Sequence, residues 1–173
     1  MNKIKEKALD LLNNNKPFFI FISLRLAVSF LLFLSVFFTF FKVIQLFDIN
    51  KIQPTEFPGS GIFILLMIVL PIASVFLLLL ENTKFQKPIN LSHAIISSIF
   101  LLWGLLLFFA TKSEAATVAS TEVKIAFGFF LQLLLICYLW IIIFGEKKLV
   151  ELFEKYLGSS KEVTSSEPDI ANE

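Results

Sequence analysis

The sequence is poor in the residues that build reactive and metal-binding sites. It contains one cysteine, Cys137, and one histidine, His93. A single cysteine excludes an intrachain disulfide and a cysteine metal cluster. A single histidine excludes bis-histidine haem ligation within one chain. We therefore predict no catalytic residue, no metal and no cofactor, and we expect that the chain is not an enzyme.

Charge is also scarce. The formal net charge is +1, which gives no general attraction to nucleic acid, so no nucleic-acid partner is expected. Arg25 is the only arginine among 15 lysine and arginine residues. This preference for lysine, together with many phenylalanine, isoleucine and asparagine residues, is typical of an AT-rich genome and favours a bacterial source.

Long apolar runs are abundant. Hydrophobic residues make up 57% of the chain, above the roughly 45–50% of soluble domains. Four segments have about the twenty apolar residues that cross ~30 Å of hydrocarbon. Their backbones must satisfy their own hydrogen bonds in lipid, which predicts helices. The sequence predicts an all-α polytopic membrane protein with four transmembrane helices in an antiparallel bundle, at residues 18–41, 61–80, 91–110 and 125–144.

The basic residues predict an orientation. Eleven lysine and arginine residues fall on one side of the predicted helices and four on the other. The larger set is Lys3, Lys5, Lys7, Lys16, Arg25, Lys84, Lys87, Lys147, Lys148, Lys155 and Lys161. Cytoplasmic segments carry such an excess. We therefore expect a multi-pass protein of the cytoplasmic (inner) membrane with both termini in the cytoplasm.

The chain divides into four parts around this membrane domain. Residues 1–16 form a cytoplasmic amphipathic segment and residues 17–145 form the four-helix transmembrane domain. Residues 146–158 form a second cytoplasmic amphipathic helix, which Gly158 caps. Residues 159–173 are polar and lack aromatics, which predicts disorder. The two amphipathic segments are expected to lie as short interfacial helices along the headgroups, or alternatively to dock on a partner.

Helical spacing predicts which sides of the helices pack together. Small and polar residues mark the packed face of a helix in lipid, and bulky apolar residues face the acyl chains. The predicted packed faces contain Arg25, Ser29, Ser35 and Thr39 in the first helix, His93, Ser97, Gly104 and Thr111 in the third, and Gly128, Gln132, Leu135 and Leu139 in the fourth. The residues predicted to face lipid are Phe30, Phe33, Phe37 and Phe41.

Two further residues carry structural predictions. Pro71, at the centre of the second helix, removes a backbone hydrogen bond and frees the carbonyl of Met67. We expect a packed kink there, with a hinge or transport pathway as the alternative. Gln132 is expected to form an interhelical hydrogen bond rather than to line a conduit.

Arg25 is the main candidate for function, and three interpretations remain open. Its head could extend to the cytoplasmic headgroups, bond to neighbouring helices, or bind an anionic lipid head or an acidic group of a partner. No carboxylate lies inside the four predicted helices, and Glu81 is the nearest candidate. We take Arg25, His93 and Ser97 as the candidate residues for lipid or partner contact.

The sequence favours a small non-catalytic integral membrane protein that acts through helix association. It could be an accessory subunit, a scaffold or an immunity-type protein. Its expected partners are the lipid bilayer and either further copies of itself, as a homo-oligomer, or another membrane protein. The alternative is an oligomeric channel or a small transporter component. Pro71, Gln132 and Arg25 are the residues that favour it, because transport proteins usually contain broken helices and ionisable residues within the membrane.

Overall fold

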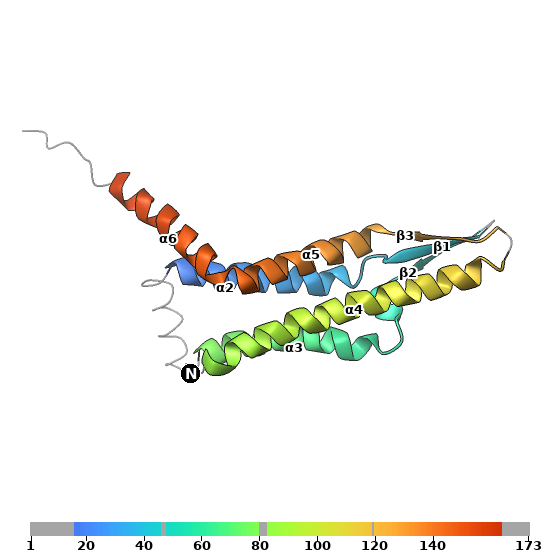
Figure 1. Ribbon diagram of the computed structural model, residues 1–173, viewed down its shortest axis with the longest axis horizontal. Coiled ribbons are helices and arrows are strands. Elements are labelled where there is room, and N and C mark those ends of the chain that lie inside the picture. Colours follow the sequence, from blue (N-terminus) through green and yellow to red (C-terminus); the bar gives the residue numbers. More distant parts are fainter. Residues whose placement is uncertain (1–15, 46–47, 80–82, 119, 164–173) are drawn as a thin grey trace, which may run out of the picture.

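The computed structural model describes residues 16–45, 48–79, 83–118 and 120–163, and these residues are mostly helical (Figure 1). The α-helices are α2 (Lys16–Ser35), α3 (Ser60–Leu79), α4 (Gln86–Ala115), α5 (Phe127–Phe144) and α6 (Glu146–Val163). The strands are β1 (Phe41–Gln45), β2 (Asp48–Ile52) and β3 (Glu122–Ile125), and two short 3₁₀ helices are η1 (Pro54–Glu56) and η2 (Thr83–Phe85).

Four of these helices, α2 to α5, are long and apolar enough to cross a membrane. The four predicted apolar helices are thereby confirmed, and α3 and α5 begin and end within two residues of the expected limits. Helix α4 has 30 residues, or about 45 Å at 1.5 Å per residue. It therefore extends beyond the length that ~30 Å of hydrocarbon requires.

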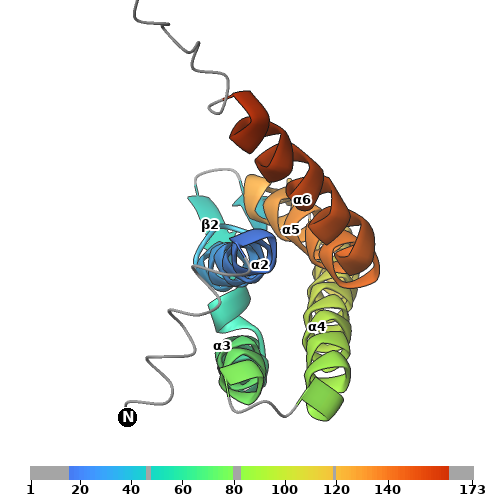
Figure 2. The ribbon, with the colours of Figure 1, turned by 90° about the vertical axis from the view of Figure 1, so that its left-hand side faces the viewer.

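Successive long helices run in opposite directions and lie side by side (Figures 1 and 2). Helix α2 contacts α3 and α5, and α4 contacts the same two helices. Only a minority of the residues in each apolar helix are buried inside the chain. Much of the apolar surface is consequently left for contacts outside the chain.

The predicted packed faces agree with the burial of the side chains. Arg25, Ser29 and Ser35 of α2 are buried, as are His93, Ser97 and Gly104 of α4. In α5 the buried set includes Gly128, Gln132, Leu135 and Leu139. Phe30 and Phe37 are exposed and Phe33 is intermediate. Phe41 is an exception, because it lies in strand β1 rather than in a helix and is buried. Thr39 and Thr111 are also exceptions, because both were predicted to be packed but are only partly buried, and Thr39 lies beyond the end of α2.

The first helix ends earlier than expected. It stops at Ser35, where the amides of Val36, Phe37 and Phe38 bond to carbonyls three residues back. The Ser35 hydroxyl also donates to the Leu32 carbonyl at 2.6 Å. These short turns satisfy the last carbonyls of the helix. The expected span of residues 18–41 therefore overran the helix by six residues, because the apolar run continues into the turn and the strand.

A small sheet corrects the all-α prediction. Strand β1 is central, with β2 and β3 antiparallel on its two sides. The connection at residues 42–61 thus holds two strands and a 3₁₀ helix. Alternation explains the sheet, because Phe41 and Val43 point to one face and Lys42 to the other. The buried side of the sheet packs near the end of α4, where Phe41 and Phe108 have ring centroids 5.8 Å apart.

A cluster of phenylalanine rings joins the sheet to the helices. The ring centroids of Phe40 lie 5.3 Å from Phe57 and 5.2 Å from Phe129. We refer to the phenylalanine cluster as Phe40, Phe41, Phe57, Phe100, Phe108 and Phe129, all of which are buried. Gly104 of α4 makes room for it, because a Cβ there would lie 2.8 Å from Phe40 and Phe57 ring atoms.

Helix α6 also differs from its predicted limits. It begins at Glu146, as expected, but continues past Gly158 to Val163. The expected disordered segment therefore begins with helical residues 159–163, and residues 164–173 lie outside the described residues. Leu149, Val150 and Phe153 of α6 pack on the hydrophobic core. The predicted amphipathic segment of residues 1–16 lies outside the described residues, except for Lys16.

We predict that Gly104→Ala destabilises the fold by about 1–3 kcal/mol, because the added methyl group overpacks the phenylalanine cluster. Gly61→Ala is the matched control, since a Cβ at Gly61 has no neighbour within 4 Å. Thermal unfolding in a mild detergent measures both. Equal melting temperatures for the two variants would contradict the tight packing at Gly104.

Candidate functional site

The candidate site starts from Arg25, whose side chain lies between helices. Arg25 is 4% exposed. Its Nη2 donates to the Ser74 hydroxyl of α3 at 2.6 Å, and that hydroxyl donates to Asn90 Oδ1 of α4 at 2.5 Å. The chain of hydrogen bonds therefore connects α2, α3 and α4. This geometry matches the interpretation in which Arg25 bonds to neighbouring helices.

The partners of Arg25 among the described residues leave much of its charge uncompensated. A guanidinium has five N–H donors and no acceptor, and Ser74 accepts one of them. Among the described residues Arg25 forms no salt bridge, but its charge interacts with the carboxylate of Glu146 at the start of α6. Glu81, which the sequence indicated as the nearest acidic partner of Arg25, lies outside the described residues. A buried cation held mainly by neutral groups has capacity for a further anionic partner.

A hollow of about 340 Å³ opens beside Arg25. Phe21 and Asn90 line it together with Arg25, and Lys87, Glu146 and Lys147 contribute charged groups. Four elements meet here, namely α2, the first two turns of α4, the end of α5 and the start of α6. With three cationic residues and one carboxylate, the Arg25 hollow favours anionic groups.

The other two candidate residues lie further along α4. His93 is 3% exposed and interacts electrostatically with Arg25. Its Nε2 has no hydrogen-bond partner among the described residues. Ser97 is fully buried, and its hydroxyl donates to the carbonyl of His93 in its own helix. The structure thus brings Arg25 and His93 together, whereas the Ser97 hydroxyl is already used within α4.

Gln132 lies in the interior without the bond predicted for it. Its side chain is 0% exposed, and neither Oε1 nor Nε2 has a hydrogen-bond partner within the described parts of the chain. The expected interhelical hydrogen bond is therefore not formed with any described residue. An unpaired buried amide costs about 1–3 kcal/mol.

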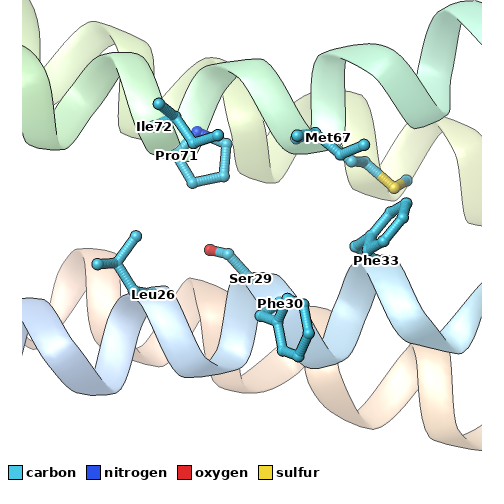
Figure 3. Close-up of a pocket in the computed structure, with 8 residues that line it drawn as sticks. Leu26, Ser29, Phe30, Phe33, Met67, Pro71 and Ile72 are labelled. Carbon is cyan, nitrogen blue, oxygen red and sulfur yellow. The ribbon is translucent and has the colours of Figure 1, made fainter.

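Pro71 lines a second hollow, of about 390 Å³, between α2 and α3 (Figure 3). Leu26 and Phe30 approach from α2 and Met67 and Ile72 from α3 (Figure 3). None of its lining residues is ionisable. This groove offers shape but no charge, so the Arg25 hollow is the better candidate site.

Asn90 and Glu146 belong to the site but were not singled out in the sequence. Asn90 precedes His93 by three residues, which places both on one face of a helix. The signal was hidden because the third span was expected to begin at residue 91, whereas α4 begins at Gln86. Glu146 could not have been found, because its approach to Arg25 depends on how α6 leaves α5.

No group of three or more histidine, cysteine or acidic side chains in the described ranges could hold a metal ion. Comparisons with protein-family models, curated proteins and solved structures found no match.

We predict that Ser74→Ala lowers the free energy of unfolding by about 1–3 kcal/mol, because Arg25 and Asn90 each lose a buried partner. Ser97→Ala is the matched control. Both serines are fully buried, but the Ser97 hydroxyl bonds only to its own helix. Thermal denaturation in mild detergent measures the difference, and equal losses would show that the bonds to Ser74 add nothing.

Proposed function

We propose that this chain is a non-catalytic multi-pass membrane protein that acts by associating with another membrane protein or with further copies of itself. The observation that carries this proposal is the Arg25 hollow. It combines a buried guanidinium, an amide and two lysines with a single carboxylate. The hollow suits an acidic group supplied from outside the chain.

An acidic residue near the end of a partner helix is the occupant that we propose. A carboxylate accepts two N–H groups of a guanidinium side by side, which gives direction as well as charge. Lys87 and Lys147 lie at exposed positions and add attraction at longer range. The accessory subunit, the scaffold and the immunity-type protein are all consistent with such a contact.

We further propose that α2 to α5 form an antiparallel transmembrane bundle in the cytoplasmic membrane of a bacterium, with both termini in the cytoplasm. The four helices have the required length and composition. The excess of lysine at the α6 end supports the orientation. The Arg25 hollow would then open toward the cytoplasmic surface, and the sheet would lie on the opposite side.

The orientation predicts a labelling pattern in intact cells. In a Cys137→Ser background, Ser113→Cys lies at the sheet end of α4 and Glu154→Cys lies on α6, both exposed. A membrane-impermeant maleimide should label Ser113→Cys directly and Glu154→Cys only after permeabilisation. The reverse pattern would overturn the orientation.

Association predicts a complex heavier than the 19.7 kDa chain after cross-linking in native membranes and extraction in mild detergent. Lys87→Gln with Lys147→Gln should weaken recovery of the partner about tenfold, or about 1.4 kcal/mol, because two positive charges that attract the acidic group are removed. Neither exposed lysine takes part in the hydrogen bond between Arg25 and Ser74, so the fold should be retained.

Lys84→Gln with Lys148→Gln is the control, because it removes the same charge at the same end of the molecule but outside the hollow. A monomer under all conditions would contradict association. Equal loss of partner recovery in both double variants would show that the hollow takes no part in the contact.

The buried Gln132 amide and His93 imidazole favour the second candidate, an oligomeric channel or transporter component. Ion flux in liposomes that contain the purified protein would support this second candidate, whereas vesicles that remain tight would contradict it.

A further inference from the structure

The three-stranded sheet brings lysines from all three strands into one row. Lys42 of β1 lies opposite Lys51 of β2 on one side and opposite Lys124 of β3 on the other. Residues directly opposite in antiparallel strands share a face. With strands about 4.8 Å apart, the lysine row of Lys51, Lys42 and Lys124 spans about 10 Å. The sequence does not show this row, because its members are separated by 9 and by 82 residues.

The lysine row is unfavourable by itself. Like charges directly opposite on neighbouring strands destabilise a sheet. Lys124 has a partner, since its Nζ lies 2.9 Å from Glu122 Oε2. Within the described ranges Lys42 and Lys51 form no salt bridge. Two adjacent cations therefore have no carboxylate partner in the described part of the chain, an arrangement that an external anion would stabilise.

A recess of about 210 Å³ lies against the row. Lys42 and Lys51 line it, together with Thr39 and the start of α5 at Phe127 and Gly128. The backbone draws close here, because the Gly128 amide donates to the Thr39 carbonyl at 2.9 Å. The positive end of the α5 dipole adds to the potential of the two lysines.

The surroundings of the recess indicate where such an anion would come from. Phe38 and Phe127 also line it; they are 47% and 68% exposed, and their ring centroids lie 6.3 Å apart. Phe38 follows the end of α2, and Phe127 is the first residue of α5. The recess therefore has an apolar side, formed by these rings, and a cationic side, formed by the lysines. That combination corresponds to the boundary between acyl chains and headgroups.

We infer that the lysine row and its recess bind the phosphate of an anionic phospholipid in the leaflet at the sheet end. The phosphate lies between Lys42 and Lys51, while Phe38 and Phe127 contact the adjoining part of the lipid. This inference rests on the membrane insertion within the proposed function, but not on the Arg25 hollow or on any protein partner.

The test uses the full chain and the double variant Lys42→Gln with Lys51→Gln. In neutral detergent the variant should melt about 2–4 °C above the wild type, because the repulsion is removed. In nanodiscs, replacing half of the phosphatidylcholine with phosphatidylglycerol should raise the melting temperature of the wild type by a similar amount and leave the variant unchanged.

Lys84→Gln with Lys148→Gln is the control for general charge effects, because both lysines lie at the other end of the molecule. It should respond to phosphatidylglycerol as the wild type does. A response that the row variant retains, or that the control also loses, overturns the inference. Inorganic phosphate in detergent is the second arm. If it alone reproduces the stabilisation, the site takes free phosphate and the assignment to a lipid is wrong.

Failure here is distinct from failure of the proposed function. If the chain still forms its complex but the lysine row shows no response to lipid, only this inference is wrong. If the chain is recovered from membranes without detergent, both this inference and the proposed function are wrong. Membrane fractionation detects that second outcome.

Discussion

The arrangement of the helices depends on how one guanidinium is buried. Removing an unpaired charge from water costs several kcal/mol even after relaxation, and the only arginine of the chain is 4% exposed. Ser74 reduces that cost by accepting a hydrogen bond from Arg25, and it donates in turn to Asn90. The first bond requires α3 to lie close to α2, and the second requires α4 to lie close to α3. Because the groups come from three helices, the hydrogen bonds can form only when those helices adopt their mutual positions. Helix α5 then closes the arrangement through contacts with α2 and α4.

Most of the helical structure could be predicted from the sequence, because one rule for helices in lipid identifies both the helices and their packed faces. Where apolar side chains surround a helix, the small and polar residues identify the packed face. That rule located the buried sides of α2, α4 and α5. It failed where the chain leaves the helices. Residues 36–41 are as apolar as the helix before them, so hydropathy could not separate a turn and a strand from a span. The alternation of polar and apolar residues in Glu122–Ile125 was the available signal for β3. Four residues are too few to distinguish a strand from a loop by this pattern.

The candidate site could be predicted only in part, and for a different physical reason. Arg25 and His93 stand out because ionisable residues in apolar helices are rare. Their surroundings do not stand out. Asn90, Lys87 and Glu146 are ordinary polar residues at helix ends. They become a site only because α4 begins early and α6 contacts α2. The register that places Lys42 opposite both Lys51 and Lys124 is likewise set by strand pairing between distant segments, which no periodicity within one segment reports.

The two ends of the molecule present positive charge in physically different ways. At the α6 end, the buried Arg25 guanidinium is held beside the hollow by its hydrogen bond to Ser74, so its donors have defined directions. At the sheet end, Lys51 and Lys124 are exposed and Lys42 is half-buried. Their flexible ammonium groups respond to charge with little demand on shape. A fixed guanidinium suits one defined partner group, whereas a row of lysines suits headgroups that exchange and reorient. The apolar surface of α2 to α5 separates the two, so an anion bound at one end is not expected to reach the other. In the proposed arrangement, the lysine row would contact headgroups at one membrane surface, and the Arg25 hollow would remain open to a partner at the other.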